Sequence, residues 1–294
     1  MTIRPRRSAL YMPASNRRAI EEARTLPCDV VILDLEDSVA PEAKEEARSN
    51  AVAAIRAGGF GTRELVIRVN GLGTPWAEAD LAAAATSGAD AVLAPKVDDA
   101  RAVDRYLAAL AEAPASMGFW AMVETCRAIF RLDAVAGEIG TNRSGALVLG
   151  TNDLAKEMRA ALTVERAPFL AMMGLAVAAA RGNGLAILDG VYNAFDDDAG
   201  LERQCSEARA YGFDGKTLIH PRQVEIANRL FSPSAGEIAW AKAAIAAFEA
   251  PGNAGKGAIR VGGEMIERLH LDQARHILAT AADGGGSLDA NRKV

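Results

Sequence analysis

Short apolar runs alternate with longer amphipathic stretches along the first three quarters of the chain. Eight runs of four to six residues are rich in Val, Leu, Ile and Ala, as expected for strands that are buried on both faces of a parallel sheet. This pattern predicts strands at Ala9–Met12, Val30–Leu35, Leu65–Val69, Ala91–Ala94, Gly118–Val123, Ala146–Gly150, Leu185–Asp189 and Lys216–Ile219.

The stretches between these runs have the composition of helices. Ala, Glu and Arg predominate in segments such as Pro41–Ala57, Ala77–Ser87 and Arg101–Glu112. Pro41 suits the first turn of its helix, where a missing N–H costs no hydrogen bond. Repeated strand–helix units of this kind predict an α/β fold, a (β/α)8 TIM barrel. A doubly wound open sheet is the alternative.

The pattern changes after residue 233. We expect a barrel catalytic domain over residues 1–233 and a C-terminal helical extension, acting as a lid, over residues 234–294. Helices are predicted at Glu237–Ala250 and Leu269–Ala282, with a glycine-rich connection and the strand-like piece RVGGEMIE between them. The last twelve residues have the composition of a flexible tail.

Composition and charge exclude several classes of partner. A chain of 294 residues can bury one large core, and its net charge of −5 argues against nucleic acid as a partner. No segment approaches the ~20 apolar residues of a membrane span. The N-terminus lacks the apolar centre of a signal peptide. Cys28, Cys126 and Cys205 are widely spaced, which predicts free thiols in a reducing, cytoplasmic setting.

Charged residues follow the predicted strands at several places. The carboxyl ends of all strands in such a barrel meet at one rim, so residues far apart in sequence become neighbours there. The residues gathered in this way are Glu36, Asp37, Arg68, Lys96, Glu124 and Asp153. A ring of carboxylates around an arginine suits a divalent cation and an acidic substrate.

Two of these acids are our candidate metal ligands. Glu124 follows the apolar run FWAMV, and Asp153 follows ALVLGTN. Either acid alone commonly caps the next helix, but their joint position at neighbouring strand ends favours a shared Mg²⁺. Glu36 and Asp37 are better placed behind the metal, where they would orient metal-bound water.

The two basic residues of the rim suit an anionic substrate. Arg68 lies in the otherwise apolar run LVIRVN, and an inward-facing arginine is costly to bury without an anion. We expect Arg68 to bind a substrate carboxylate or thioester oxygen; the alternative is an ion pair with Glu36 or Asp37. Lys96 could serve the same anion or form a salt bridge at the rim, and both interpretations stay open.

Two further segments carry candidate chemistry. The loop MPASNRR after the first strand offers backbone amides and two arginines that suit a phosphate, although a basic helix start is often only solvated. Lys216 and His220 lie around the eighth strand. A structural role for this histidine is preferred to an acid–base role.

Long motifs along nearly the whole chain resemble those of a known family. They read RSALYMP, VILDLEDSVAPEAK, VIRVNG, APKV, ETCRAI, LGTNDLA, DGVYNAFDD, GFDGKTLIHPRQ and FSPS. Together they resemble the citrate lyase β subunits and malyl-CoA lyases of the HpcH/HpaI aldolase superfamily. The tract GTNDLAKE, with DGVYNAF and GFDGKTLIHP, looks closest to the (3S)-malyl-CoA thioesterase branch.

The resemblance implies a (β/α)8 barrel that forms a homotrimer or hexamer and uses Mg²⁺ and a CoA thioester. Glu124 and Asp153 match the metal ligands of the family, and Glu124 thereby also contacts the substrate. Arg68 matches its substrate-binding arginine, with Lys96 beside it. Acids of the DLED type, here Glu36 and Asp37, lie behind the metal.

The resemblance is incomplete at two places. In the lyases a C-terminal aspartate from an adjacent subunit is the acid–base residue; here the segment reads GEMIE, and Glu267 stands at that position, as in the thioesterase branch. Many relatives also carry two basic residues near the CoA phosphates, where this chain has Asn16 and Glu22. Contact with the CoA is therefore expected from Tyr11, Arg17 and Arg18.

The function implied first is a lyase that cleaves or forms the C–C bond of a β-hydroxyacyl-CoA. For malyl-CoA the products would be acetyl-CoA and glyoxylate. The first alternative is a (3S)-malyl-CoA thioesterase that releases malate and CoA. The second is a citrate lyase β-type subunit, which would convert a citryl thioester to oxaloacetate and an acetyl thioester within a complex.

Overall fold

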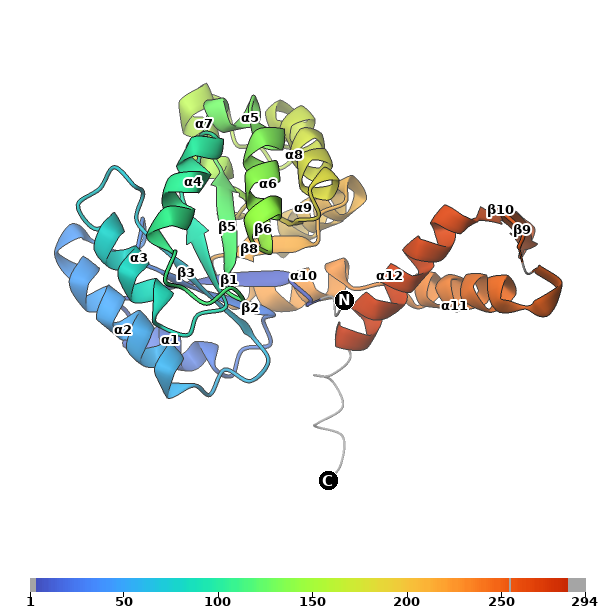
Figure 1. Ribbon diagram of the computed structural model, residues 1–294, viewed down its shortest axis with the longest axis horizontal. Helices are drawn as coiled ribbons and strands as arrows, with labels where there is room; N and C mark the ends of the chain where they lie inside the picture. Colours follow the sequence, from blue (N-terminus) through green and yellow to red (C-terminus); the bar gives the residue numbers. More distant parts are fainter. Residues whose placement is uncertain (1–3, 254, 285–294) are drawn as a thin grey trace. The chain divides into compact units, whose positions relative to one another are not determined.

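The computed structural model describes residues 4–253 and 255–284, and it confirms the predicted (β/α)8 barrel (Figure 1). Eight parallel strands form one closed barrel in chain order. Strand β1 pairs with β8, with Ser8 beside Lys216, so the open-sheet alternative is wrong. The strands are β1 Ser8–Pro13, β2 Val30–Asp34, β3 Glu64–Arg68, β4 Ala91–Ala94, β5 Gly118–Val123, β6 Gly145–Leu149, β7 Ala186–Asp189 and β8 Gly215–Leu218.

Helices follow the strands and cover the outside of the barrel (Figure 1). The segment predicted as one helix from Pro41 begins with a 3₁₀ turn, η1 Pro41–Ala43, before α2. The other helical elements up to residue 231 are α1 Arg17–Ala23, α2 Lys44–Ala57, α3 Ala77–Ala85, α4 Ala100–Ala109, α5 Cys126–Ile129, α6 Leu132–Asn142, α7 Thr151–Met158, η2 Ala167–Phe169, α8 Leu170–Gly182, α9 Asp198–Tyr211 and α10 Gln223–Phe231.

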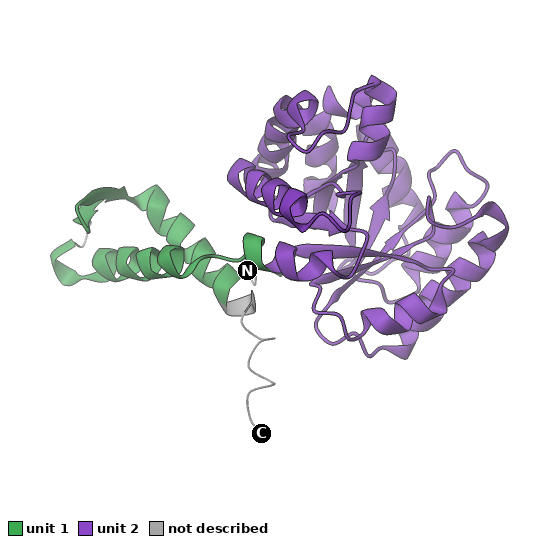
Figure 2. Ribbon diagram, turned by 180° about the vertical axis from the view of Figure 1, so that it is seen from behind, with its two compact units in different colours: residues 1–5, 229–294 green, residues 6–228 purple. Residues whose placement is uncertain are grey.

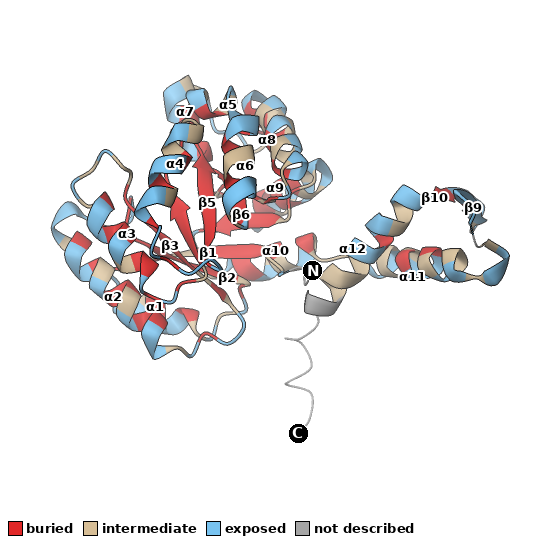
Figure 3. Ribbon diagram, viewed as in Figure 1, coloured by how far each residue is buried: buried red, intermediate tan, exposed pale blue. Residues whose placement is uncertain are grey.

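The barrel interior is filled by alternate residues of each strand. Val30, Ile32, Val66, Trp120, Met122 and Val148 are among the members of this buried apolar cluster, and Figure 3 shows the strands buried along their length. Side chains of a strand alternate between its two faces. The next inward positions after this cluster are therefore Asp34, Arg68, Glu124 and Gly150, at the carboxyl ends of their strands.

The chain divides into two compact units, residues 6–228 and residues 229–294 with the first five residues (Figure 2). The second unit contains α11 Ala235–Glu249, η3 Pro251–Asn253, β9 Ala258–Val261, β10 Glu264–Glu267 and α12 Arg268–Gly284. The strand-like piece expected here is an antiparallel hairpin, with a turn at Gly262 and Gly263. Its role as a lid stays a prediction. The first two residues of the predicted flexible tail, 283 and 284, belong to α12, and the rest of the tail lies outside the described residues.

Within this second unit a small core holds the elements together. Ala241 and Ala244 of α11 pack with Ile259 and Ile266 of the hairpin and with Ala274 of α12. Helix α11 begins with a capping box, in which Ser234 and Glu237 each satisfy a main-chain N–H of the other.

Two further observations concern membrane-spanning helices and cysteines. No helix in the described part of the chain has both the length and the apolar character needed to cross a membrane. Cys28 and Cys205 are buried, Cys126 is partly exposed, and none of the three forms a disulfide bond, as predicted.

Candidate active site at the barrel mouth

Arg68, at the end of β3, has a partner that the sequence analysis missed. Its Nε and Nη2 donate to the two carboxylate oxygens of Asp34 on β2, both at 2.6 Å. Register explains the pairing, because Asp34 and Arg68 lie directly opposite each other. Both residues are buried. Burial disfavours ionisation of Asp34, but the Arg68 charge outweighs it and lowers the pKa of Asp34 below its ordinary value.

Glu36 lies between the two basic residues of the mouth. Its Oε1 is 2.7 Å from Nζ of Lys96, and its Oε2 is 3.1 Å from Nη1 of Arg68. The predicted alternative of an ion pair between Arg68 and Glu36 is therefore present. Asp37 is more distant, at 3.9 Å from Arg68, and is exposed. The Lys96 side chain is half exposed, so its amine can reach solvent and a ligand as well as Glu36.

Glu124 follows β5 and is almost completely buried, with 1% of its surface exposed. Its Oε1 accepts a hydrogen bond from the main-chain N–H of Lys96 at 2.7 Å. Its Oε2 is buried and has no hydrogen-bond partner among the described residues. Burial, together with the negative charges of Glu36 and Asp153, raises the pKa of Glu124 to about 8. A positive charge beside Oε2 would favour the ionised form of this carboxylate.

Asp153 is partly exposed in the first turn of α7, which begins directly after Gly150. Its charge is near enough to Glu124 to contribute to the raised pKa of that residue. Gly150 allows the main chain after β6 to lie close to the Glu124 side chain. A Cβ on residue 150 would lie 2.4 Å from Cβ and 2.5 Å from Oε2 of Glu124. A glycine is thus required where β6 passes Glu124.

The donor set fits Mg²⁺. A hard cation prefers oxygen ligands and often keeps several waters beside one or two protein carboxylates. The unpartnered Oε2 of Glu124 and the neighbouring Asp153 carboxylate are oxygen donors of this kind. No set of three or more His, Cys, Asp or Glu side chains in residues 4–253 and 255–284 is arranged to hold a metal ion.

A buried amine supports the loop that carries Glu36. Nζ of Lys44 donates to the carbonyl oxygens of Leu35 and Glu36 and to Oδ1 of Asn70, each at 2.8 Å. Asn70 in turn donates to Leu35 and to the buried carboxylate of Asp80. These bonds hold the main chain around Glu36 in one conformation.

The predicted CoA-binding residues lie at the first strand and helix. Tyr11 is on β1, and the guanidinium of Arg68 lies over its ring at 4.7 Å. Arg17 and Arg18 are both exposed in the first turn of α1. Nε of Arg17 donates to Asn50, and Asn16 caps this helix through Ala19. Tyr11 therefore belongs to the charged mouth, whereas the two arginines remain accessible to an anion.

The eighth strand carries a structural cluster on its outer side. Lys216 is fully buried and donates to Asp189 at 2.6 Å, and Arg166 donates to both oxygens of Asp189 at 2.8 and 2.7 Å. His220 stacks on Phe195 with ring centroids 4.9 Å apart and accepts a hydrogen bond from the following loop. These contacts agree with a structural role for the histidine.

Glu267 is exposed at the end of β10 in the second unit. Its main-chain N–H donates to Nδ1 of His270 at 2.8 Å, which fixes the start of α12. Its proposed acid–base role remains a prediction.

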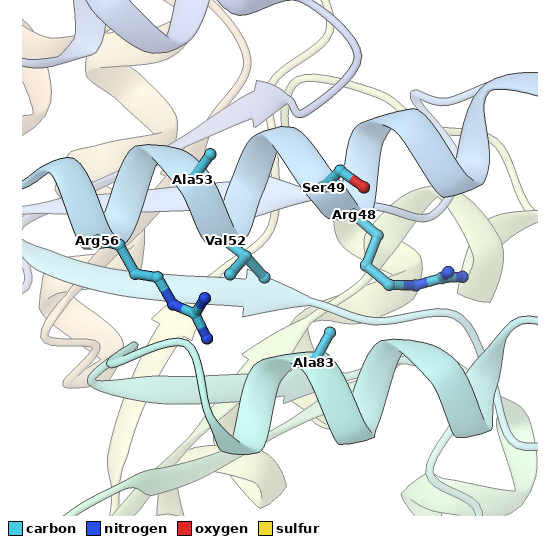
Figure 4. Close-up of a pocket in the computed structure, with 6 residues that line it drawn as sticks. All are labelled: Arg48, Ser49, Val52, Ala53, Arg56 and Ala83. Atoms are coloured by element: carbon cyan, nitrogen blue, oxygen red, sulfur yellow. The ribbon is translucent and has the colours of Figure 1, made fainter.

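A shallow groove elsewhere on the barrel unit is unrelated to the strand ends. It lies between α2 and α3 and is lined by Arg48, Ser49, Val52, Ala53, Arg56 and Ala83 (Figure 4). Arg48 is paired there with Asp80 at 2.7 Å. The groove contains none of the predicted site residues.

Sequence reasoning missed three residues of the mouth. The sequence pattern places Asp34 within an apolar strand. Its position two residues after the inward-facing Ile32 indicates that its carboxylate faces the barrel interior as well. Gly150 could be recognised as the next inward position of its strand, but not as a neighbour of Glu124. Lys44 carries no local signal that separates it from an ordinary helix-surface lysine.

Comparisons with known proteins agree with this architecture. A model of the family "HpcH/HpaI aldolase/citrate lyase" matches residues 7–221. The chain is similar to a (3S)-malyl-CoA thioesterase of Cereibacter sphaeroides, with 46% identity over 278 residues that cover 94% of this chain and 95% of the relative. It is also similar to an L-malyl-CoA/beta-methylmalyl-CoA lyase of the same species, with 33% identity covering 95% of both chains.

A solved structure shows the same fold. Protein CitE from Mycobacterium tuberculosis, crystallised in complex with magnesium, acetoacetate and coenzyme A, superposes with a TM-score of 0.75. The two sequences are 27% identical, and the match covers 95% of this chain and 98% of that chain.

Proposed function

The chain belongs to the HpcH/HpaI aldolase/citrate lyase family, and we propose that it is a Mg²⁺-dependent thioesterase that hydrolyses (3S)-malyl-CoA to malate and CoA. The observation that carries this proposal is the similarity to a malyl-CoA thioesterase along nearly the whole chain. Glu267 supports it as well. At this position the lyases carry an aspartate, whereas the thioesterase branch resembles this chain in carrying a glutamate. The sequence alone favours the lyase reaction; the higher identity to the thioesterase moves our preference to hydrolysis.

In this proposal the anionic substrate binds between the two basic residues of the mouth. Beyond the two N–H groups that Asp34 accepts, Arg68 has N–H groups on Nη1, which contacts Glu36 and Met122, and a second N–H on Nη2. We assign to them the thioester carbonyl oxygen, where negative charge develops during attack by water. The half-exposed amine of Lys96 would leave Glu36 in part to pair with the substrate carboxylate.

Glu124 and Asp153 would hold Mg²⁺, with Glu36 and Asp37 orienting its water molecules. The ion would supply Lewis-acid polarisation of substrate oxygens. The buried Oε2 of Glu124 gives this assignment its physical support. We keep the proposal that Tyr11, Arg17 and Arg18 contact the CoA.

Hydrolysis requires a base for the attacking water. We propose Glu267 of an adjacent subunit for this step: its carboxylate accepts a proton from water as the water oxygen bonds to the thioester carbon. Collapse of the tetrahedral adduct breaks the C–S bond, and the thiolate of CoA takes up the proton. We also retain the expectation of a homotrimer or hexamer, which sedimentation of the full chain would test.

A second candidate is C–C cleavage to acetyl-CoA and glyoxylate. It is favoured by the similarity to a malyl-CoA lyase over 95% of the chain. The same charged mouth would serve it, since Arg68 can stabilise the oxyanion of a thioester enolate as well as that of a tetrahedral adduct.

One assay distinguishes the candidates. The purified full chain is incubated with (3S)-malyl-CoA and Mg²⁺, and free thiol, malate and glyoxylate are quantified. Equal amounts of free thiol and malate support hydrolysis. Glyoxylate with acetyl-CoA contradicts it and supports the lyase. Release of neither product would contradict both and favour the subunit of a larger complex.

A further inference from the structure

We propose that Asp34 is the positioning residue of the barrel mouth: it orients the Arg68 guanidinium and the Glu36 loop together, so that Arg68 presents its remaining N–H groups to the substrate. This inference rests on the proposed function for its kinetic consequence. Its geometric part concerns Asp34, Arg68 and the backbone that carries Glu36.

The Asp34 carboxylate is completely buried, and its acceptor capacity is used in two directions. Toward β3, its two oxygens accept from Nε and Nη2 of Arg68. Along its own chain, Oδ1 accepts from the N–H of Glu36 at 2.9 Å, and Oδ2 accepts from the N–H and hydroxyl of Ser38. One side chain therefore fixes both the arginine and the backbone that carries Glu36.

The planar shape of a guanidinium makes this contact directional. Asp34 occupies the edge formed by Nε and Nη2, so the plane of Arg68 cannot rotate without breaking two charge-assisted hydrogen bonds. The N–H groups left over belong to Nη1 and Nη2 and lie on the other edges. Nη1 is 3.1 Å from Oε2 of Glu36 and donates to Sδ of Met122 at 3.8 Å, which places this edge at the charged mouth, where a substrate oxygen would compete with those two contacts.

The other contacts of Arg68 do not fix its direction as firmly. The 3.1 Å pair with Glu36 and the 3.8 Å bond to Sδ of Met122 both involve the single nitrogen Nη1, and Asp37 is at 3.9 Å. The ring of Tyr11 supports the guanidinium plane at 4.7 Å, but stacking permits rotation within that plane. Without the Asp34 carboxylate, Arg68 would be free to turn a different edge toward Glu36.

The chain contains a matched control on another part of the barrel. Asp189, at the end of β7, is also completely buried and accepts two hydrogen bonds from an arginine, Arg166. It pairs as well with Lys216, and none of these residues belongs to the mouth. Asp189→Asn thus removes the same kind of buried charge without touching Arg68.

The kinetic test is a double-mutant cycle with (3S)-malyl-CoA. We expect Asp34→Asn to lower kcat/KM by roughly 10²-fold, the scale of a lost transition-state donor. If Asp34 acts through Arg68, adding Asp34→Asn to Arg68→Gln produces little further loss. Asp189→Asn combined with Arg68→Gln should give additive effects. Additive losses for Asp34→Asn and Arg68→Gln would overturn the inference, since a general effect on folding is additive.

A spectroscopic test does not depend on turnover. The ¹⁵Nε–¹Hε resonance of Arg68, assigned by its absence in Arg68→Gln, should move and exchange faster in Asp34→Asn. It should stay in place in Asp189→Asn. An Arg68 resonance that is unchanged by Asp34→Asn contradicts the inference. If Asp34→Asn does not fold, Ser38→Ala removes one hydrogen bond to Asp34, and an unchanged Arg68 resonance in that variant is the contradicting result.

The two tests separate this inference from the proposed function. A wild-type protein that does not release thiol from malyl-CoA contradicts the function, while the Arg68 resonance still decides the role of Asp34. Suppose that the wild type turns over normally, that Arg68→Gln lowers turnover, and that Asp34→Asn leaves it within threefold. This result supports the function and contradicts the inference.

Discussion

The main-chain N–H of Lys96 donates a hydrogen bond of 2.7 Å to Oε1 of Glu124, while the Lys96 side chain bonds Glu36, also at 2.7 Å. Lys96 has a φ of 52°, in the left-handed region that costs a residue with a Cβ roughly 1–2 kcal/mol. This backbone conformation accompanies the bond from N–H to Glu124. One residue thus joins two acids of the mouth through two different groups.

The backbone and the amine of Lys96 can be separated by substitution. Lys96→Gly and Lys96→Met both remove the amine, so we expect both to raise KM for the substrate by a similar factor, about tenfold. Glycine adopts positive φ freely, so Lys96→Gly should be more stable than Lys96→Met by about 1 kcal/mol in urea unfolding. Greater stability of Lys96→Met would show that the left-handed conformation carries no strain.

Removal of the Glu124 charge should abolish the response to Mg²⁺. At ten times its Kd, Mg²⁺ should stabilise the wild-type protein by about 1.4 kcal/mol, measured as a rise in Tm. Glu124→Gln should lose this rise, because a neutral amide replaces the buried, unpartnered Oε2. Glu157→Gln, at an exposed acid on the same helix as Asp153, serves as the control. An equal Mg²⁺ response in Glu124→Gln and the wild type would contradict the ligand assignment.

The space beside Glu124 should tolerate no Cβ. In Gly150→Ala the new carbon would meet Glu124 Cβ at 2.4 Å, which forces the carboxylate to move. We expect turnover to fall by at least ~10-fold, since small displacements of catalytic groups are costly. Gly174→Ala in α8 is the matched control, because its nearest atom would be 3.8 Å away. That control should be slightly stabilised, and a Gly150→Ala enzyme with full activity would show that Glu124 need not be fixed.

Acid should weaken the fold partly through Asp189. Burial opposes its ionisation, but the charges of Lys216 and Arg166 dominate and hold the pKa of Asp189 below its ordinary value. A carboxylate with a depressed pKa stabilises the fold above its unfolded pKa, roughly 3.9, and this contribution is lost as pH falls through the lower, folded value. Asp189→Asn should therefore lower the free energy of unfolding by about 3–5 kcal/mol at pH 7. Below pH 4 the variant should lose less stability with falling pH than the wild type does. Urea unfolding at several pH values measures this, and an unchanged pH slope would refute it.

The sequence by itself determined the barrel and several of the charged residues at its mouth. Runs such as Val30–Leu35 and Gly118–Val123 could be recognised because strands buried on both faces must be apolar throughout. In a closed parallel barrel every strand ends at the same rim, so Arg68, Glu124 and Asp153 could be placed near one another without coordinates. This conclusion needs only the order of strands and helices.

Only the tertiary structure decided which of these residues contact one another. The pairing of Asp34 with Arg68 depends on the register of two strands more than thirty residues apart in the chain, which no local pattern encodes. The burial of Lys44 under the Glu36 loop, and the approach of Gly150 to Glu124, depend in the same way on how separate strand–helix units pack. Hydrophobic periodicity specifies which face of an element is buried, whereas side-chain partners are fixed by packing between elements.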